Sequence, residues 1–241
     1  MDKKVLNKML RPKSVAVVGA SATPGKIGYS VISNLLKDGY KGKIYPINPK
    51  ETEILGVKCY AELKDVPGEI DSAVMCVPAK AMVQMTEECG KKGVKGLIVI
   101  TSGFSEIGRK DLEDEIVNIA KRYGMRILGP NIVGSLSNSD KFNGSFCPSL
   151  PLPGKASLVS QSGALLIALA MATWTRKVGF DKLISIGNMA DVDFADLIEW
   201  FNDDDDTSCV SLYIEGLKNG RRFIDAAKNS KKPIIALKSG V

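Results

Sequence analysis

Residues 15–28 read VAVVGASATPGKIG, and this stretch decides the predicted fold. Residues 15–18 are apolar and run straight into Gly19, a pattern typical of a short strand buried on both faces of a parallel sheet. Apolar residues then recur at helical spacing from Val31 to Leu36. A strand that turns into a helix aims the first helical N–H groups, and the positive end of the helix dipole, at one place. The stretch therefore predicts a site for a phosphorylated ligand.

The spacing within residues 19–28, which we call the first turn, argues against two common nucleotide motifs. A P-loop has four residues between its first Gly and its Gly-Lys pair. Here five residues separate Gly19 from Gly25, and Ile27 takes the place of the magnesium-binding hydroxyl. The dinucleotide fingerprint needs a second glycine where Ser21 stands. Neither a P-loop nor a typical NAD site is predicted.

The second predicted strand, residues 43–47, indicates a different ligand. NAD-binding folds place a carboxylate near the end of this strand to hold the ribose diol. Here Asn48, Pro49 and Lys50 follow the strand. A cation there suits an extra phosphate on the adenosine ribose, so NADP and coenzyme A are the indicated ligands. The alternative is a glycine turn that packs a helix on a strand and binds nothing.

Composition sets the class of protein. The 241 residues are enough for two α/β domains, and the hydrophobic (44%) and charged (25%) fractions are those of a globular protein. The sequence shows neither an apolar run of membrane-spanning length nor a secretory signal pattern, which predicts a cytoplasmic protein. The five cysteines are widely spaced without a CxxC pair, so neither a metal site nor a disulfide framework is predicted.

Charge and histidine content narrow the function. The formal charge of +6 suits an anionic ligand, but the lysines are dispersed and aromatics make up only 6%, so nucleic acid is not indicated. The sequence contains no histidine. This excludes a Ser-His or Cys-His hydrolase and an imidazole-bound metal within these residues.

The first part of the chain alternates strands with turns and helices. The predicted strands are residues 15–18, 43–47, 71–76, 96–101 and 126–128, and a helix is predicted over 110–123. The alternation is typical of a doubly wound parallel sheet, whose ligands lie beyond the carboxyl ends of the strands. The pattern predicts one domain over 1–131.

Periodicity is lost over residues 132–154. This segment is rich in Ser, Asn, Gly and Pro, which predicts a connecting segment with the character of a surface loop. A long functional loop within one domain is the alternative for its second half.

A second strand–turn–helix unit begins at residue 155. Residues 156–159 predict a strand and 164–176 a helix, and the second turn between them, residues 160–163, reads SQSG. Hydroxyl, amide and N–H groups at a helix start again indicate an anion site. A nucleophile elbow is excluded because Ser160 replaces the first glycine of that motif and no histidine base exists.

Further strands are predicted over 182–186, 209–214 and 233–237, and helices over 194–202 and 221–229. Glu215 follows the strand CVSLYI and should lie at the carboxyl edge of the sheet near the second turn. The acidic run 203–206 predicts a solvated loop.

Eight ordered segments resemble one family. GASATPGKIG, INPK, CVP, ITSGF, LGPN, VSQSGAL, YIEG and KSG together are similar to the N-terminal part of NDP-forming acyl-CoA synthetases, the ADP-forming acetate–CoA ligase family, related to the α subunit of succinyl-CoA synthetase. The resemblance implies an α/β chain with a Rossmann-like CoA-binding domain followed by a flavodoxin-like doubly wound domain over 155–241. That second domain looks truncated, so the chain is expected to be part of a longer protein.

The resemblance also implies roles for individual residues. The CoA phosphates would contact Gly19, Ser21, Pro24, Gly25 and Lys26, with Asn48, Pro49 and Lys50 near the adenosine and Val77, Pro78, Thr101 and Asn131 along the groove to the thiol. Ser160, Gln161, Ser162 and Gly163 would hold phosphate or acyl phosphate, and Glu215 would orient a phosphohistidine.

The implied reaction converts an acid, CoA and ATP into acyl-CoA, ADP and phosphate through an acyl phosphate and a phosphohistidine. Because the chain has no histidine, it is expected to be inactive alone and to work with an ATP-grasp domain or subunit that binds ATP or ADP with magnesium, in an oligomer. The alternatives are a CoA-sensing regulatory module of a protein acyltransferase and an NADP-dependent oxidoreductase.

Overall fold

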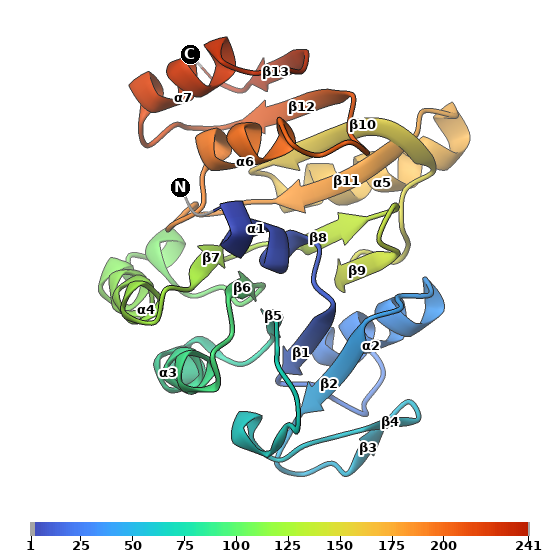
Figure 1. Cartoon of the computed structure of the whole chain (residues 1–241), viewed down its shortest axis with the longest axis vertical. Helices are drawn as coiled ribbons and strands as arrows, with labels where there is room; N and C mark the ends of the chain where they lie inside the picture. The colour runs from blue at the N-terminus through green and yellow to red at the C-terminus, as the bar shows by residue number, and fades with distance from the viewer. Residues whose placement is uncertain (1–2, 241) are drawn as a thin grey trace.

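The computed structural model describes residues 3–240 and contains two α/β units (Figure 1). The sheet of the first unit has five parallel strands in the order β2-β1-β5-β6-β7. Its main elements are α1 (Lys3–Leu10), β1 (Ser14–Val18), α2 (Ile27–Lys37), β2 (Lys43–Ile47), β5 (Ser72–Met75), α3 (Met82–Lys92), β6 (Gly96–Val99), α4 (Lys110–Arg122) and β7 (Arg126–Leu128). The predicted Rossmann-like sheet is confirmed. A short hairpin, β3 (Glu53–Ile54) and β4 (Val57–Lys58), was not predicted.

Strand β1 lies inside this sheet with helices on both faces. Val15 and Val17 pack toward α1 and α2, whereas Ala16 and Val18 pack toward α3 and α4. All four side chains are buried, as the continuous apolar run predicted.

The sheet of the second unit is mixed, with six strands in the order β13-β12-β10-β11-β8-β9. Its elements are β8 (Gly134–Ser137), β9 (Phe142–Ser145), β10 (Pro153–Ser160), α5 (Gly163–Arg176), β11 (Phe180–Ser185), α6 (Phe194–Phe201), β12 (Cys209–Ile214), α7 (Gly220–Lys228) and β13 (Ile234–Lys238). Strands β10 to β13 run parallel, while β8 is antiparallel to both β11 and β9. The flavodoxin-like prediction is confirmed, with an antiparallel extension.

The expectation that residues 132–154 form a surface-like connection is wrong. Strands β8 and β9 lie in this segment, and every residue of both strands is buried. The polar residues of β8 and β9 led us to expect a solvent-exposed segment, but their polar groups form hydrogen bonds inside the protein. Asn34 of α2, for example, donates hydrogen bonds to the carbonyl oxygens of Ser145 and Cys147 at 2.9 and 2.8 Å. The proposed boundaries at 131 and 155 stay a prediction.

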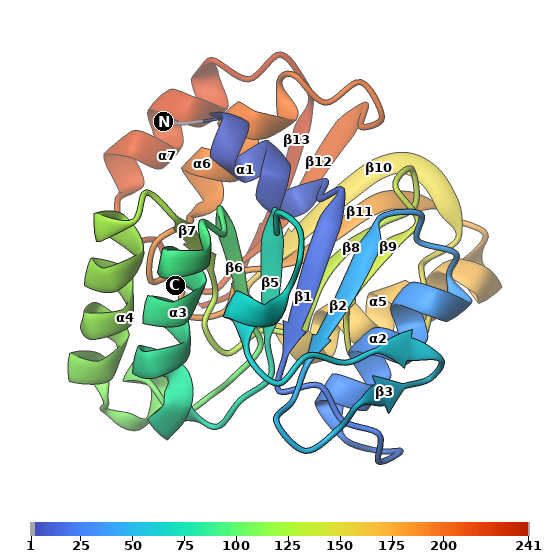
Figure 2. The same cartoon turned by 60° about the horizontal axis from the view of Figure 1, so that its bottom comes forward.

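The two units share a hydrophobic core. Helix α1 lies between the two sheets (Figure 1), and its Leu6 and Met9 belong to one buried cluster with Ile98 of β6, Ile184 of β11 and Phe201 of α6. Figure 2 shows α6 and α7 on the side of the second sheet that faces α1, and α5 on its other side. Within residues 3–240, no helix has the length and apolarity needed to cross a membrane.

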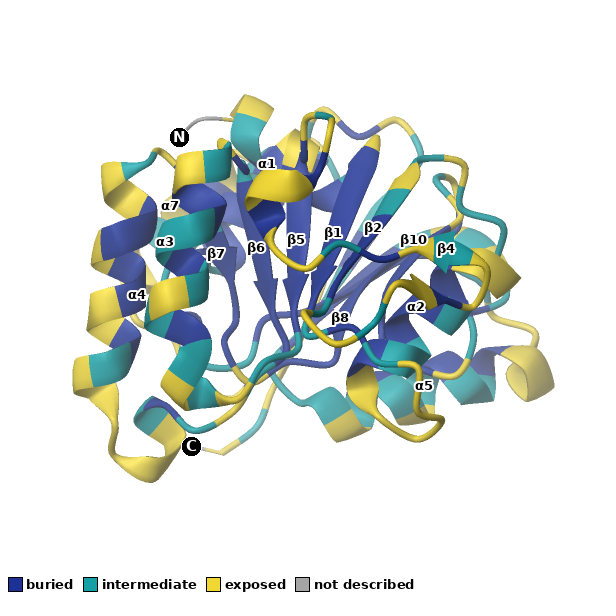
Figure 3. Ribbon diagram, turned by 90° about the horizontal axis from the view of Figure 1, so that it is seen from below, coloured by how far each residue is buried: buried dark blue, intermediate teal, exposed yellow. Residues whose placement is uncertain are grey.

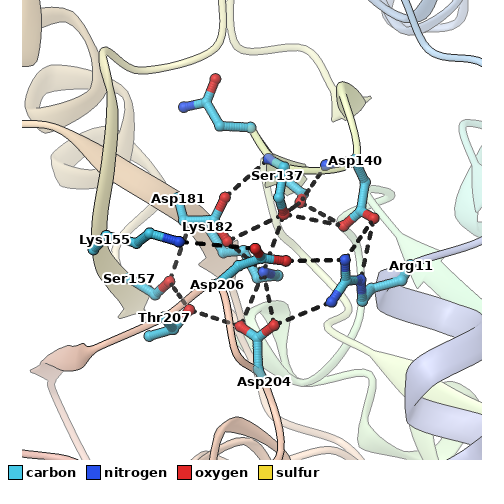
Figure 4. A network of polar contacts seen from close by, with 12 residues as sticks. Arg11, Ser137, Asp140, Lys155, Ser157, Asp181, Lys182, Asp204, Asp206 and Thr207 are labelled. Atoms are coloured by element: carbon cyan, nitrogen blue, oxygen red, sulfur yellow. Dashed lines mark hydrogen bonds and ion pairs between the residues drawn. The ribbon is translucent and has the colours of Figure 1, made fainter.

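A polar network at the amino ends of the strands also joins the units (Figure 4). Arg11 follows α1 and its guanidinium contacts Asp140, Asp204 and Asp206 at 3.1, 3.2 and 3.0 Å. Lys182 of β11 is buried and lies 2.9 Å from Asp204, which is itself buried. The prediction of a solvated acidic loop over 203–206 is therefore wrong at Asp204, because two cations from distant segments neutralise its carboxylate.

We predict that Asp204→Asn, which keeps the shape but removes the charge, lowers the free energy of unfolding at pH 7 by about 3 kcal/mol in a urea titration. Burial alone would raise the pKa of Asp204, but the hydrogen bonds from Thr207 and Lys182 and the nearby Arg11 charge outweigh burial and hold this pKa below its ordinary value. The Asp204 carboxylate therefore contributes its full stabilisation of the folded state above the unfolded-state pKa of about 3.9. This stabilisation is lost as the pH falls through the lower folded-state pKa.

The difference between wild type and variant should accordingly shrink below about pH 4. Asp205→Asn, at the exposed neighbouring position, is the control and should change stability by less than about 0.5 kcal/mol. Equal losses in the two variants, or a difference that persists in acid, would contradict the assignment.

Candidate functional site

The carboxyl edges of the two sheets meet where β7 and β11 end. A Cβ atom on Gly187, whose φ is +47°, would lie 2.4 Å from the carbonyl oxygens of Pro130 and Asn131, so only glycine permits this approach. The backbone N–H groups of Asn188 and Ala190 donate to the carbonyl oxygens of Pro130 and Gly129 at 3.1 and 2.9 Å. Figure 3 shows β5, β6 and β7 running side by side toward one edge of the first sheet.

Two glycines bring α2 against the end of β1 at the first turn. A Cβ on Gly28 would lie 2.2 Å from the carbonyl oxygen of Gly19, and a Cβ on Gly19 would lie 2.9 Å from the backbone of Cys76. Lys26 is the N-cap of α2 but its side chain makes no capping hydrogen bond. The first N–H groups of α2 thus have neither an intrahelical partner nor a side-chain cap, as an anion site requires.

The rest of the first turn is open to solvent. Pro24, Gly25 and Lys26 are exposed, and Gly25 has a φ of +84° with no atom near its missing Cβ. Ser21 accepts a hydrogen bond from the N–H of Thr23 at 3.1 Å, so its hydroxyl shapes the turn.

Asn48 links the end of β2 to the first turn through hydrogen bonds. Its Nδ2 donates to the carbonyl oxygen of Ala20 at 2.7 Å, and its Oδ1 accepts from the N–H of Lys50 at 2.8 Å. Pro49 and Lys50 are exposed beside it. The three predicted adenosine-end residues therefore adjoin the five predicted phosphate residues.

The predicted groove residues come together along the same edge. Thr101 Oγ1 donates to the carbonyl oxygen of Val77 at 2.7 Å, and the carbonyl oxygen of Thr101 accepts from the N–H of Asn131 at 3.0 Å. Pro78, next to Val77, is exposed. Burial raises the pKa of the neighbouring Cys76 thiol to about 12, so Cys76 is protonated at neutral pH and is a poor nucleophile.

The second turn uses its hydroxyls internally. Ser160 is fully buried, and its Oγ donates to the carbonyl oxygen of Ser162 at 2.8 Å. Ser162 is the N-cap of α5 and accepts from the N–H of Leu165 at 3.3 Å. The Ser160 proton is thus used inside the protein, whereas the Ser162 hydroxyl accepts a hydrogen bond and keeps its own proton to donate. The backbone N–H groups left at the helix start are those of Gly163 and Ala164, because the N–H of Leu165 is capped.

Gln161 joins the second turn to Glu215. Its Oε1 accepts hydrogen bonds from the N–H groups of Glu215 and Gly216 at 2.7 and 2.9 Å, and its own N–H donates to the carbonyl oxygen of Tyr213. The Glu215 carboxylate is exposed at this edge. The sequence placed Glu215 near this turn but did not indicate that Gln161 makes the connection.

Sequence reasoning missed a further polar group at the edge. Asn188, in the loop that follows β11, donates to carboxylate oxygens of Glu106 and Glu113 at 2.6 and 2.9 Å. These carboxylates belong to the segment after β6 and to α4, far from Asn188 in sequence. No local motif predicts the pairing, although Glu106 lies two residues after the ITSGF segment. Among residues 3–240, no cluster of three or more acidic or cysteine side chains could hold a metal ion.

Two family models match the chain in order. The model described as "CoA binding domain" covers residues 13–136, and the one described as "Succinyl-CoA ligase like flavodoxin domain" covers residues 153–241.

Known proteins match nearly the whole chain. The α subunit of ADP-forming acetate–CoA ligase I from Pyrococcus furiosus is 51% identical, over 98% of this chain and 53% of that protein. The ADP-forming acetate–CoA ligase of Methanocaldococcus jannaschii is 53% identical, over 95% of this chain and 32% of that protein.

A solved structure shows the same fold at comparable identity. The dinucleotide-forming acetyl-coenzyme A synthetase 1 of Ca. Korarchaeum cryptofilum, in complex with phosphate and ADP, superposes with a TM-score of 0.95 at 46% identity, over 98% of this chain and 52% of that chain. The present chain spans about half the length of these relatives, or less. The ordered domain models and these relatives confirm the predicted resemblance, and the chain belongs to the ADP-forming acyl-CoA synthetase family, related to the α subunit of succinyl-CoA synthetase.

Proposed function

We propose that this chain supplies the CoA-binding and acyl-phosphate-binding part of an ADP-forming acyl-CoA synthetase. The observation that carries the proposal is the joined carboxyl edge, on which two strand–turn–helix units present the starts of α2 and α5. The overall reaction converts an acid, CoA and ATP into acyl-CoA, ADP and phosphate. The relatives named above are ligases, which favours a synthetase over the CoA-sensing module.

The CoA phosphates are assigned to the first turn. The uncapped N–H groups of α2 and the exposed Lys26 supply hydrogen-bond donors and positive charge. Gly25 leaves room for close approach of a phosphate because nothing lies near its α carbon on the open side. Lys50 is assigned to the phosphate on the adenosine ribose, and Asn48 sets its position by accepting its backbone N–H.

The pantetheine arm is assigned to the edge between Val77, Pro78, Thr101 and Asn131. The hydrogen bonds that link Val77, Thr101 and Asn131 make this edge continuous from β5 to β7. Since β7 meets β11 at Asn131, the thiol end is directed toward the second unit.

Phosphate or acyl phosphate is assigned to the second turn. The backbone N–H groups of Gly163 and Ala164, with the dipole of α5, favour negative charge on phosphoryl oxygens. The exposed Glu215 carboxylate is suited to accept an imidazole N–H and so fix the tautomer of a phosphohistidine. That histidine must come from outside this 241-residue sequence, as must an ATP-grasp domain or subunit that binds the nucleotide with magnesium.

We predict that titration calorimetry shows binding of CoA and no binding of NADP. Lys50→Glu should weaken CoA binding by about tenfold, because it replaces an attractive charge beside a phosphate with a repulsive one. Lys41→Glu is the matched control, since Lys41 is exposed at the other end of β2 and the change in net charge is identical. Absence of CoA binding would refute the proposed function, and equal loss in both variants would refute the position assigned to the ribose phosphate.

We predict that Gln161→Ala loosens the connection between the second turn and Glu215. Loss of the shared acceptor should increase hydrogen exchange at the Glu215 and Gly216 amides by about tenfold in NMR measurements. Gln161→Glu retains an acceptor oxygen and should keep the protection. Unchanged exchange in the alanine variant would show that Gln161 does not hold this segment.

A further inference from the structure

One amide side chain reaches across the joined edge from the second unit to the first. Asn188 Nδ2 lies 2.6 Å from Glu106 Oε2, 2.9 Å from Glu113 Oε2 and 3.1 Å from Ser105 Oγ. Asn188 Oδ1 lies 3.4 Å from Asn131 Nδ2. An NH2 group between two carboxylates is the favourable orientation, because a flipped amide would direct its oxygen at both of them.

The carboxylate of Glu106 organises the segment that follows Thr101. It accepts the backbone N–H groups of Gly103 and Phe104, so it closes this segment into a compact turn. Burial alone would raise the pKa of Glu106, but the hydrogen bonds from Gly103 and Asn188 outweigh burial and lower it. Glu106 is therefore ionised at neutral pH and available as an acceptor.

Glu113 fixes the same segment from α4. It is buried, and its Oε2 accepts the hydroxyl of Ser105 at 2.7 Å as well as the amide of Asn188. Two carboxylates thus approach one another at this point; the Ser105 hydroxyl donates to Glu113, but the Asn188 amide is the donor that bridges both carboxylates. Without that donor their repulsion would push residues 103–107 apart from α4.

The other contacts of Asn188 are with the segment that follows β7. Its backbone N–H donates to the Pro130 carbonyl oxygen, and its side chain meets that of Asn131. Thr101 is bound to Asn131 through its carbonyl oxygen and begins the segment that Glu106 closes. Asn188 consequently contacts Asn131 directly and, through Glu106, the segment that follows Thr101.

We propose that Asn188 is a positioning residue, supplied by the second unit, that holds the 101–107 segment and Asn131 in the arrangement that receives the thiol end of CoA. This inference rests on the proposed function, because it assumes that CoA occupies the joined edge. Its chemical basis is the amide: only a neutral side chain that donates toward Glu106 and Glu113 and accepts from Asn131 satisfies all three neighbours.

The sharpest test exchanges donor for acceptor. Asn188→Asp preserves the shape but sets a third carboxylate against Glu106 and Glu113, so CoA binding should weaken at least tenfold by calorimetry at pH 7.5. Amide exchange at Gly103 and Phe104 should rise in the same variant. Asn7→Asp, on the exposed face of α1, is the matched control and should leave both measurements unchanged.

A second substitution that restores CoA binding would distinguish a positioning role of Asn188 from a general loss of structure. In the double variant Asn188→Asp with Glu106→Gln, the new amide can donate to the new carboxylate while Glu113 still repels it, so CoA affinity should recover in part, to a level between those of Asn188→Asp and wild type. A protein that loses structure without Asn188 would not regain affinity from Glu106→Gln.

The outcomes separate the two proposals. If the wild-type chain does not bind CoA, the proposed function fails and this inference fails with it. If it binds CoA but Asn188→Asp binds equally well, or the double variant binds no better than Asn188→Asp, the positioning role is refuted and the proposed function stands. Should both single variants unfold, recovery of folding and CoA binding in the double variant supports the inference, and failure to recover overturns it.

Discussion

The structure depends on a backbone contact between two sheets. Gly187 lies against the carbonyl oxygens of Pro130 and Asn131, at a distance that no side chain permits. Hydrogen bonds from Asn188 and Ala190 to the same short segment fix its register. Ligands of open α/β sheets bind beyond the carboxyl ends of the strands. Joining two such sheets at these ends creates one extended edge from two smaller ones, and the first and second turns both belong to it.

A second set of contacts, at the amino ends of the strands, also holds the two sheets together. Arg11 and Lys182 share the buried carboxylate of Asp204, while α1 fills the space between the sheets with apolar side chains. Breaking such a pair on one side leaves an uncompensated buried charge, which is far more costly than loss of an exposed ion pair. With one polar anchor at each end and a shared core between them, the two units are held as one body.

The sequence predicted what local patterns encode. Strand β1, the first turn and α2 follow from a continuous apolar run, glycine spacing and helical periodicity, and the segment around Ser160 follows from the same rules. Strands β8 and β9 were missed because their polar residues are satisfied by distant partners such as Asn34. Asp204 and Asn188 were missed for the same reason, since their partners Arg11 and Glu106 lie far away along the chain. Pairings of that kind have no local signature.

The hydrogen-bonding groups that stay free in the second turn indicate which part of the site can select the acid. In the second turn, the side chains of Ser160, Ser162 and Gln161 are all engaged with the protein's own backbone. The donors left for a bound phosphate are the Ser162 O–H, the Gln161 NH2 group and the first N–H groups of α5, together with the helix dipole, and all of these recognise phosphoryl oxygens rather than the acid attached to them. If the second turn holds an acyl phosphate as proposed, it would treat different acids alike. Selection among acids must then come from side chains that line the acyl group itself, outside both turns.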